Sequence, residues 1–308
     1  MTHKASYISL LESGELEKRM AFAMNGLAEC RLCPHECKVN RVEGEKGFCK
    51  IAKKAMVSSY GAHFGEEPVI SGNKGSGTVF FTGCNMRCIY CQNFDVSQAL
   101  KGYEVTGELL AFFFLSLQEQ GCHNINLVTP SHVIPQILEG LFLAAKEGLK
   151  IPIVYNSSGY DKVSTLQILD GIVDIYMPDI KYSDSETGLK LSKVKGYWPV
   201  AKKAIREMFR QVGNLETDEN GVAYKGILIR HLVLPGDLSG TKKVCEFIAE
   251  EISSEAVVNI MDQYHPCAKA FDYPPLDRPL FPEEFHQALE WAKEAGLKRV
   301  MKFWDKTA

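Results

Sequence analysis

Apolar and polar positions are grouped in blocks along most of the chain. From Thr78 onward, short runs of β-branched and aromatic residues alternate with longer stretches that have a helical period. The short runs predict strands, at residues 78–82, 124–128, 151–155, 173–177, 226–234 and 256–261. The longer stretches predict helices, at about residues 106–120, 131–147, 161–169, 184–213, 241–252 and 282–295.

Strands that alternate with helices in this way normally pair in parallel and are joined by right-handed crossovers. The predicted fold class is therefore α/β, with six strand–helix units arranged as an open, partial (β/α)6 barrel. In barrels of parallel strands, chemistry takes place at the carboxyl ends of the strands. Cysteines and polar residues that follow the predicted strands are thus the first candidates for a functional site.

The first quarter of the chain has a different character. Residues 1–29 carry apolar positions at mixed helical spacings and predict a helical lead-in. Residues 30–75 are rich in cysteine and glycine and poor in periodic segments. We therefore expect two parts, an N-terminal segment over 1–75 with a lead-in and a Cys-rich metal knuckle, and the partial barrel over 76–308.

Cys84, Cys88 and Cys91 form a C-x3-C-x2-C motif directly after the first predicted strand. Three thiolates on one short loop can bind three irons of a [4Fe–4S] cluster, which four cysteines normally hold, so that one iron stays open. Zinc is the simpler alternative, but this loop lacks a fourth partner at the spacing of a zinc finger.

The motif, with Tyr90 just before its last cysteine, resembles the signature of the radical S-adenosylmethionine (SAM) superfamily. The resemblance implies that Cys84, Cys88 and Cys91 hold a [4Fe–4S] cluster whose open iron binds SAM. One electron then cleaves SAM to methionine and a 5′-deoxyadenosyl radical, which abstracts a hydrogen atom from a substrate. Segments at four further strand ends resemble, in the same order, those of the pyruvate formate-lyase activating enzyme branch and its uncharacterised homologues: 155–160, 177–181, 230–236 and 263–266.

This resemblance also assigns residues to SAM. Lys181 and Arg230 are expected at the methionyl carboxylate, with Arg230 as a bidentate donor. Oxygens of Asn156, Ser157 and Asp179 are expected at the amino end. The same residues, with the backbone carbonyl of Met177, are expected around a monovalent cation, although Asn156 replaces an aspartate and so removes one charge from that site. The other expected contacts are a backbone carbonyl of Thr129, a hydrogen bond from Asn93 near the cluster, and packing of Tyr90 toward adenine and of His265 against the ribose or adenine.

The segment that ends the second predicted strand departs from the activating enzyme. That enzyme has Gly-Gly-Glu, whereas this chain has residues 128–132, Val-Thr-Pro-Ser-His, as in the uncharacterised homologues. Two roles are open for His132, capping the following helix or reaching the substrate side of the cavity.

Cys30, Cys33, Cys37 and Cys49 form a second motif, C-x2-C-x3-C-x11-C. Four thiolates suit a structural, tetrahedral zinc. They equally suit a second iron–sulfur cluster without an open site. Because a small Gly-rich segment has little hydrophobic core of its own, a bound metal that links its cysteines would stabilise its fold. We expect a bound metal and leave zinc and iron–sulfur open, with free cysteines as the alternative.

Charge and composition exclude several classes of partner. The 308 residues carry a formal net charge of −3, with basic and acidic residues interspersed, so no nucleic-acid partner is expected. The apolar runs are too short to span a bilayer, and no secretory signal is recognisable, so no membrane partner is expected. Seven of the ten cysteines lie in the two motifs, which indicates metal binding in a reducing cytoplasm.

The leading functional hypothesis is a radical SAM oxidoreductase that receives its electron from a donor such as flavodoxin or ferredoxin. Its substrate is the glycine of a glycyl-radical enzyme, another protein, a peptide or a small metabolite. The alternative is an iron–sulfur electron-transfer or carrier protein without radical output, which would have no use for the polar residues at the strand ends. A zinc-dependent interaction module is a third possibility, but it would leave the barrel pattern unexplained.

Overall fold

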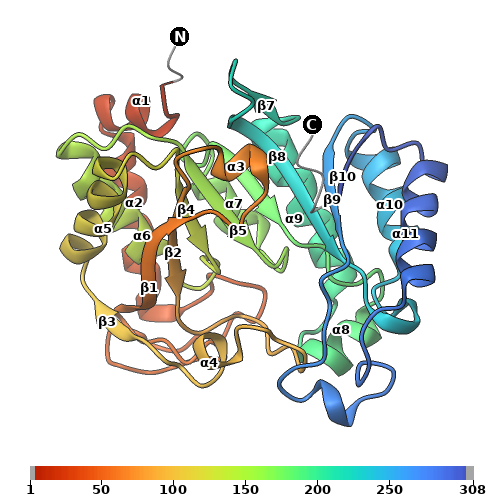
Figure 1. The fold of residues 1–308 in the computed structure, drawn as a ribbon. Helices are drawn as coiled ribbons and strands as arrows, with labels where there is room; N and C mark the ends of the chain where they lie inside the picture. The colour runs from red at the N-terminus through yellow and green to blue at the C-terminus, as the bar shows by residue number, and fades with distance from the viewer. Residues whose placement is uncertain (1–3, 303–308) are drawn as a thin grey trace.

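One mixed sheet runs through the computed structural model, which describes residues 4–302 (Figure 1). Its strand order is β10-β9-β8-β6-β5-β4-β2-β1-β3, and β7 pairs with β8. All pairs from β2 to β10 along this order are parallel. These parallel strands are β2 (Ser76–Phe81), β4 (Ile125–Val128), β5 (Ile153–Ser157), β6 (Ile175–Pro178), β8 (Ala223–Leu232), β9 (Val257–Met261) and β10 (Arg299–Lys302).

The six predicted strands and the α/β partial barrel are confirmed, but the sequence analysis missed four strands. They are β1 (Ala55–His63), β3 (Tyr103–Val105), β7 (Glu216–Thr217) and β10. Strand β1 pairs with β2 antiparallel, and β3 pairs with β1. The predicted N-terminal segment thus contributes a strand to the same sheet, and its boundary at residue 75 stays a prediction.

The predicted helices are present, one of them as two separate helices. The region 184–213 divides into α8 (Ser185–Ser192) and α9 (Tyr197–Val212), because Lys193 and Gly196 adopt left-handed backbone angles, with φ of 59° and 61°. The other helices are α1 (Tyr7–Glu12), α2 (Glu15–Asn25), α3 (Pro68–Ser71), α4 (Phe94–Ser97), α5 (Gly107–Glu119), α6 (Ile134–Lys146), α7 (Val163–Ile168), α10 (Thr241–Phe247) with a π-helical turn at Ile248–Ile252, and α11 (Pro282–Glu294). Short 3-10 turns lie at Gly26–Glu29, Pro235–Asp237 and Ala270–Asp272.

The two faces of the strands carry different side chains. On β4, Ile125 and Leu127 join the core beneath the helices, while Asn126 between them points to the other face and is fully buried. On β9, Val258 and Ile260 alternate in the same way with the buried Asn259. This period of two therefore places polar groups inside the barrel. No helix in residues 4–302 is both long enough and apolar enough to cross a bilayer.

Candidate active site

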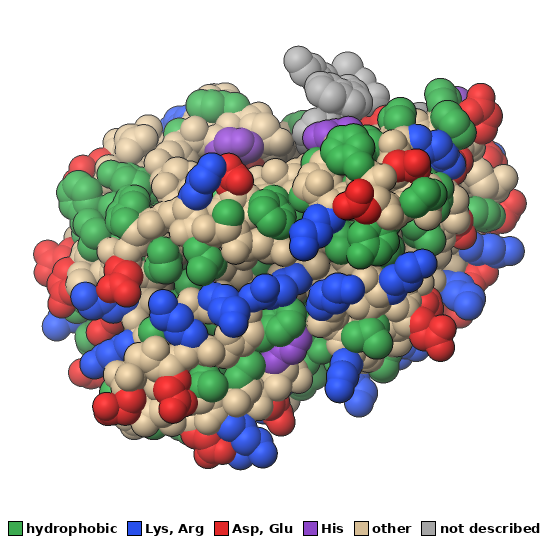
Figure 2. All heavy atoms as spheres, turned by 90° about the horizontal axis from the view of Figure 1, so that it is seen from below, with side chains coloured by type: hydrophobic (Ala, Val, Ile, Leu, Met, Phe, Trp, Pro, Cys, Tyr) green, Lys and Arg blue, Asp and Glu red, His purple; other side chains and the backbone are tan. Residues whose placement is uncertain are grey.

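A cavity of ≈ 420 Å³ lies at the carboxyl ends of the parallel strands. Except for His265, every residue that the sequence analysis assigned to the open cluster or to SAM lines this cavity. These residues are Cys84, Cys88, Tyr90, Cys91, Asn93, Thr129, Asn156, Ser157, Asp179, Lys181 and Arg230. Figure 2 views the molecule from this end of the strands, and lysine and arginine side chains form a row across the face.

The cysteine loop between β2 and α4 holds its three sulfurs beside hydrogen-bond donors. The hydroxyl of Ser192 donates to Cys88 Sγ over 3.0 Å, and the backbone N–H of Met86 lies 3.3 Å from Cys84 Sγ. The hydroxyl of Ser97 lies 3.2 Å from Cys91 Sγ. Donors of this kind stabilise thiolates, so the three side chains fit the ligands of an iron–sulfur cluster with one open iron. In residues 4–302, no group of three or more His, Cys, Asp or Glu side chains, these thiols included, is yet drawn together as metal ligands.

Burial and nearby charge act in opposite directions on the pKa of these thiols. Burial raises the pKa of Cys88 to about 11, whereas the positive charge of Lys181 and the hydrogen bond from Ser192 act in the opposite direction. Burial likewise raises the pKa of Cys84, again against the charge of Lys181. Lys181 therefore favours the thiolate form that a metal requires.

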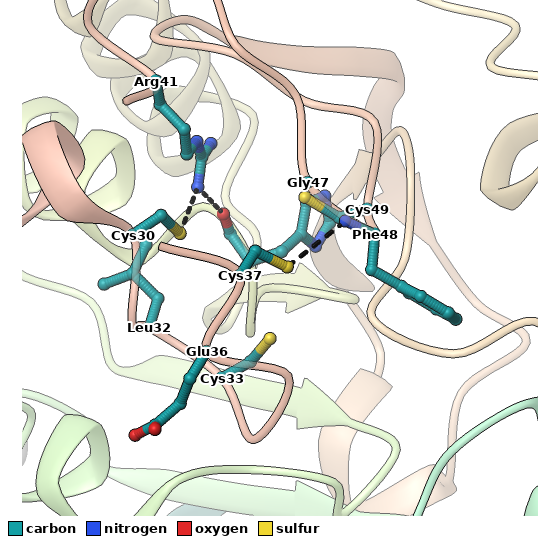
Figure 3. Close-up of a pocket in the computed structure, with 10 residues that line it drawn as sticks. Cys30, Leu32, Cys33, Glu36, Cys37, Arg41, Gly47, Phe48 and Cys49 are labelled. Atoms are coloured by element: carbon teal, nitrogen blue, oxygen red, sulfur yellow. Dashed lines mark hydrogen bonds between the residues drawn. The ribbon is translucent and has the colours of Figure 1, made fainter. Parts of the chain in front are cut away.

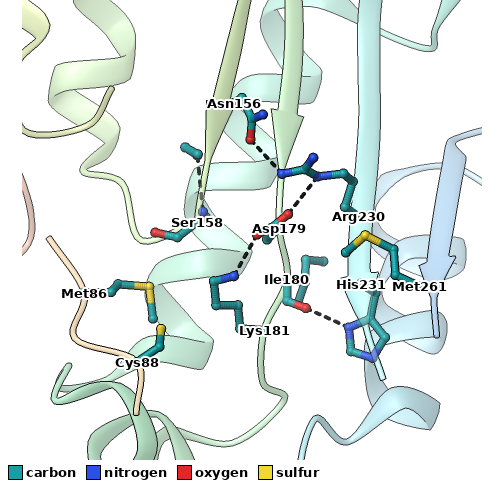
Figure 4. A network of polar contacts seen from close by, with 12 residues as sticks. Met86, Cys88, Asn156, Ser158, Asp179, Ile180, Lys181, Arg230, His231 and Met261 are labelled. Carbon is teal, nitrogen blue, oxygen red and sulfur yellow. Dashed lines mark hydrogen bonds and ion pairs between the residues drawn. The ribbon is translucent and has the colours of Figure 1, made fainter. Parts of the chain in front are cut away.

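Asp179 joins the two cationic residues of the cavity (Figure 4). Its Oδ1 accepts from Nε of Arg230 over 2.8 Å, and its Oδ2 accepts from Nζ of Lys181 over 2.7 Å. Arg230 also donates from Nη2 to Oδ1 of Asn156 over 2.7 Å. Burial alone would raise the pKa of Asp179, but the charges of Arg230 and Lys181 outweigh it and hold this pKa below its ordinary value.

This network changes how the predicted SAM contacts must be understood. Lys181 and Arg230, expected at a methionyl carboxylate, already share Asp179 as a partner. The oxygens of Asn156 and Asp179 accept from these cationic groups, at the place where a monovalent cation was expected. The cation therefore gains no support from these contacts and stays a prediction.

Two glutamates in the cavity were missed by the sequence analysis. Glu66 Oε2 lies 3.5 Å from Nη1 of Arg230, and Glu67 Oε1 accepts from Nδ2 of Asn259 over 2.8 Å. Burial raises the pKa of Glu66 to about 7, although the charge of Arg230 lowers it. Both glutamates precede α3 in the predicted N-terminal segment, where no strand end or motif marks them. Only the fold, which brings this loop back across the barrel, reveals their position.

Three other predicted residues have side chains that contact partners within the chain. The hydroxyl of Ser157 donates to Asp161 over 2.7 Å. The Tyr90 hydroxyl lies 2.6 Å from that of Tyr182, so its ring packs in an aromatic cluster. His265 is exposed, with Nδ1 3.4 Å from Nε2 of Gln92, and does not line the cavity.

Thr129 lines the cavity, and its expected contact with SAM stays a prediction. Its φ of 62° turns the chain sharply at the end of β4, and its N–H donates to the carbonyl of Asn156 over 2.9 Å. His132, three residues later, takes neither of the two roles left open. It is buried, with Nε2 2.9 Å from the carbonyl of Thr82, and it lies beside the four N-terminal cysteines.

The parallel sheet, the cysteine loop and the polar strand ends together define an α/β barrel enzyme with a cluster-binding loop. The family description "Radical SAM superfamily" matches residues 78–219. The chain is 35% identical over 294 residues to an uncharacterised protein of Methanocaldococcus jannaschii, covering 92% of this chain and 80% of that protein. This chain belongs to the radical SAM superfamily, whose members use a [4Fe–4S] cluster and SAM.

Two further similarities extend this result. The chain is 30% identical over 162 residues to the pyruvate formate-lyase-activating enzyme of Clostridium pasteurianum, covering 51% of this chain and 61% of that enzyme. Among solved structures, a radical SAM methyltransferase from Sphaerobacter thermophilus superposes with a TM-score of 0.50 at 16% identity, covering 73% of this chain and 66% of that one. At this identity, the structural match supports the fold and no particular activity.

Proposed function

We propose that this protein is an enzyme that binds a [4Fe–4S] cluster at Cys84, Cys88 and Cys91 and SAM in the adjoining cavity. The observation that carries the proposal is that the three thiols share one cavity with the Lys181–Asp179–Arg230 network. When bound, the cluster supplies the electron that cleaves SAM reductively to methionine and a 5′-deoxyadenosyl radical.

The network offers a counterpart for each charged end of SAM. Its carboxylate would take hydrogen bonds from Lys181 and from Nη1 of Arg230, whose present contact with Glu66 is long, at 3.5 Å. The ammonium group would donate to Asp179, whose pKa is held low enough for it to stay ionised. SAM thus exchanges partners with side chains that are already paired with one another, so its binding does not leave one of these buried charges without a counter-charge.

The remaining expected residues have smaller parts in this proposal. Thr129 at the end of β4 and Asn93 after the cysteine motif both line the cavity, and both would contact SAM. Asn156 and Ser157 would act mainly by fixing Arg230 and Asp161. Tyr90 would support the cysteine loop through its ring. His265 would reach the ribose or adenine only after its exposed loop moved inward.

The substrate step is hydrogen-atom abstraction, and the glycine of a glycyl-radical enzyme is the substrate that we propose. The similarity to an enzyme named for activating pyruvate formate-lyase supports this choice, although it spans only half of this chain. Another protein, a peptide or a small metabolite are the other candidates. The row of lysines and arginines across the cavity face would suit an acidic donor such as flavodoxin or ferredoxin.

The test is anaerobic reconstitution with iron and sulfide, followed by reduction, addition of SAM and quantification of 5′-deoxyadenosine. We expect 5′-deoxyadenosine from the native protein and none from the triple variant Cys84→Ala, Cys88→Ala, Cys91→Ala. A bound cluster that leaves SAM intact under reduction, also in the presence of candidate substrates, would favour the electron-carrier alternative. Deuterium transfer from a labelled glycyl peptide into 5′-deoxyadenosine would identify the substrate class.

A further inference from the structure

The four N-terminal cysteines surround a second, much smaller pocket (Figure 3). Cys30, Cys33, Cys37 and Cys49 line it together with Arg41, and the space that they enclose is ≈ 10 Å³. Such a volume holds about one water-sized sphere. A [4Fe–4S] core would need far more room than this, whereas a single metal ion would not.

Two of the four sulfurs lie beside N–H donors. The backbone N–H of Phe48 lies 3.4 Å from Cys37 Sγ, and Nη1 of Arg41 lies 3.9 Å from Cys30 Sγ. Donors beside a sulfur stabilise its thiolate form.

The surroundings of Arg41 indicate a negatively charged metal site independently of the size of the pocket. Its side chain is only 1% exposed, its Nε donates to the carbonyl of Ala52 over 2.9 Å and its Nη1 to that of His132 over 2.7 Å. Within residues 4–302 it forms no ion pair with a carboxylate, and its Nη2 has no hydrogen-bond partner. A buried guanidinium without a counter-charge is unfavourable. Four thiolates around a divalent ion carry a net charge of −2 and would supply one.

We propose that Cys30, Cys33, Cys37 and Cys49 bind a single divalent ion of the zinc class in tetrahedral geometry, and that Arg41 neutralises part of the charge of this site. Closure requires the cysteine side chains to rotate, because the thiols stand around the pocket without yet converging as ligands. The choice of one ion over a second iron–sulfur cluster rests on the size of the pocket.

The proposed ion would also brace the loop of the open cluster. Nε2 of His35 lies 2.9 Å from the carbonyl of Asn85, and Nη2 of Arg87 donates to the carbonyl of Phe48 over 3.0 Å. A Cβ at Gly83 would lie 2.7 Å from the carbonyl oxygen of Cys49. The two cysteine motifs are therefore packed directly against each other, and the role of this ion is structural.

The test uses the full chain with Cys84→Ala, Cys88→Ala and Cys91→Ala, so that only the N-terminal cysteines remain to bind metal as clustered thiols. Metal analysis of protein purified anaerobically is expected to give about one zinc per chain and no acid-labile sulfide. Iron with labile sulfide, or a protein without metal, would overturn the proposal. Either failure would leave the proposed function intact, since 5′-deoxyadenosine formation by the native chain tests that separately.

The role of Arg41 needs a measurement of affinity. In the same background, Arg41→Met is expected to weaken zinc binding by about 10- to 100-fold in competition with a chelator. The matched control is Arg31→Met, which removes an exposed arginine of the same segment and should bind zinc as before. Equal affinity for the two variants would refute the role of Arg41. If Arg41→Met does not fold, the unmodified N-terminal motif is loaded with cobalt in place of zinc. The absorption spectrum of tetrahedral cobalt bound by thiolates is expected. A spectrum of octahedral cobalt would contradict the proposed site.

Discussion

Nε of Arg230 and Oδ1 of Asp179 lie 2.8 Å apart, where the adjacent strand ends of β8 and β6 meet. Because Lys181 bonds to the other oxygen of the same carboxylate, both cations in the middle of the cavity have an anionic partner before any ligand arrives. Glu66 adds a further carboxylate beside Arg230. The site is therefore assembled by the chain itself, and the ligand has to compete with internal partners.

Asp179→Asn should destabilise the fold, because Arg230 and Lys181 would lose their shared carboxylate. Breaking a buried pair costs about 3–5 kcal/mol, and some solvent access to this cavity reduces the expected loss to about 2–3 kcal/mol in urea unfolding. Asp95→Asn, which removes the exposed partner of Lys101, should change stability by less than about 1 kcal/mol. Equal effects of the two variants would contradict the role given to Asp179.

Ser192→Ala should lower the reduction potential of the open cluster. The Ser192 hydroxyl donates to Cys88 Sγ over 3.0 Å, and a donor to a ligating sulfur favours the more negative, reduced cluster. We expect a shift to more negative values in a redox titration followed by electron paramagnetic resonance. Ser185→Ala, at the other end of α8, is the control, and an unchanged potential in Ser192→Ala would mean that the bond is lost once the cluster binds.

Gly83→Ala tests the contact between the two cysteine motifs. Gly83 has a φ of 82°, and an added Cβ would lie 2.7 Å from the carbonyl oxygen of Cys49. Gly44, with a φ of 87°, has open space around its added Cβ and is the matched control. Gly44→Ala should cost about 1 kcal/mol of stability through its backbone alone. Gly83→Ala should cost clearly more and should reduce iron incorporation; equal losses would show that the contact is unimportant.

Glu66 should make stability depend on pH. Burial raises its folded-state pKa from 4.5 to about 7, so the folded chain binds this proton more tightly than the unfolded chain does. Its contribution to the free energy of unfolding therefore falls as pH rises from about 4.5 to 7, and is constant above that. Glu66→Gln should gain about 1–3 kcal/mol relative to the native protein across this window in urea titrations. Glu119→Gln, at an exposed position, is the control and should show the same dependence of stability on pH as the native protein. If Glu66 were ionised throughout this pH range, Glu66→Gln would show that same dependence.

The sequence predicted the barrel well because its central strands are apolar runs that few other structures accommodate. It missed β1, whose Ser58, Ser59 and Gly61 interrupt the apolar pattern. It predicted one helix over 184–213, because no signal marked the left-handed conformation of Lys193. These errors share a cause, since a local pattern does not contain the contacts that override it.

For the site, the cysteines and strand-end residues were predictable because motif order fixed their place. The resemblance placed Arg230 opposite a carboxylate of SAM, but its partner within the chain, Asp179, required the structure. Glu66 and Glu67 could not be predicted, because they reach the cavity only through the return of the loop after β1. Long-range contacts of this kind carry no local signature.

The sheet of the described residues ends at β3 on one side and β10 on the other, and these two edges do not pair with each other. The wall of paired strands is thus incomplete between these two edges. A substrate lying along this gap would itself exclude water from the radical. Productive chemistry would then wait for the substrate to complete the enclosure, and SAM cleavage should be slow in its absence and accelerate when it binds.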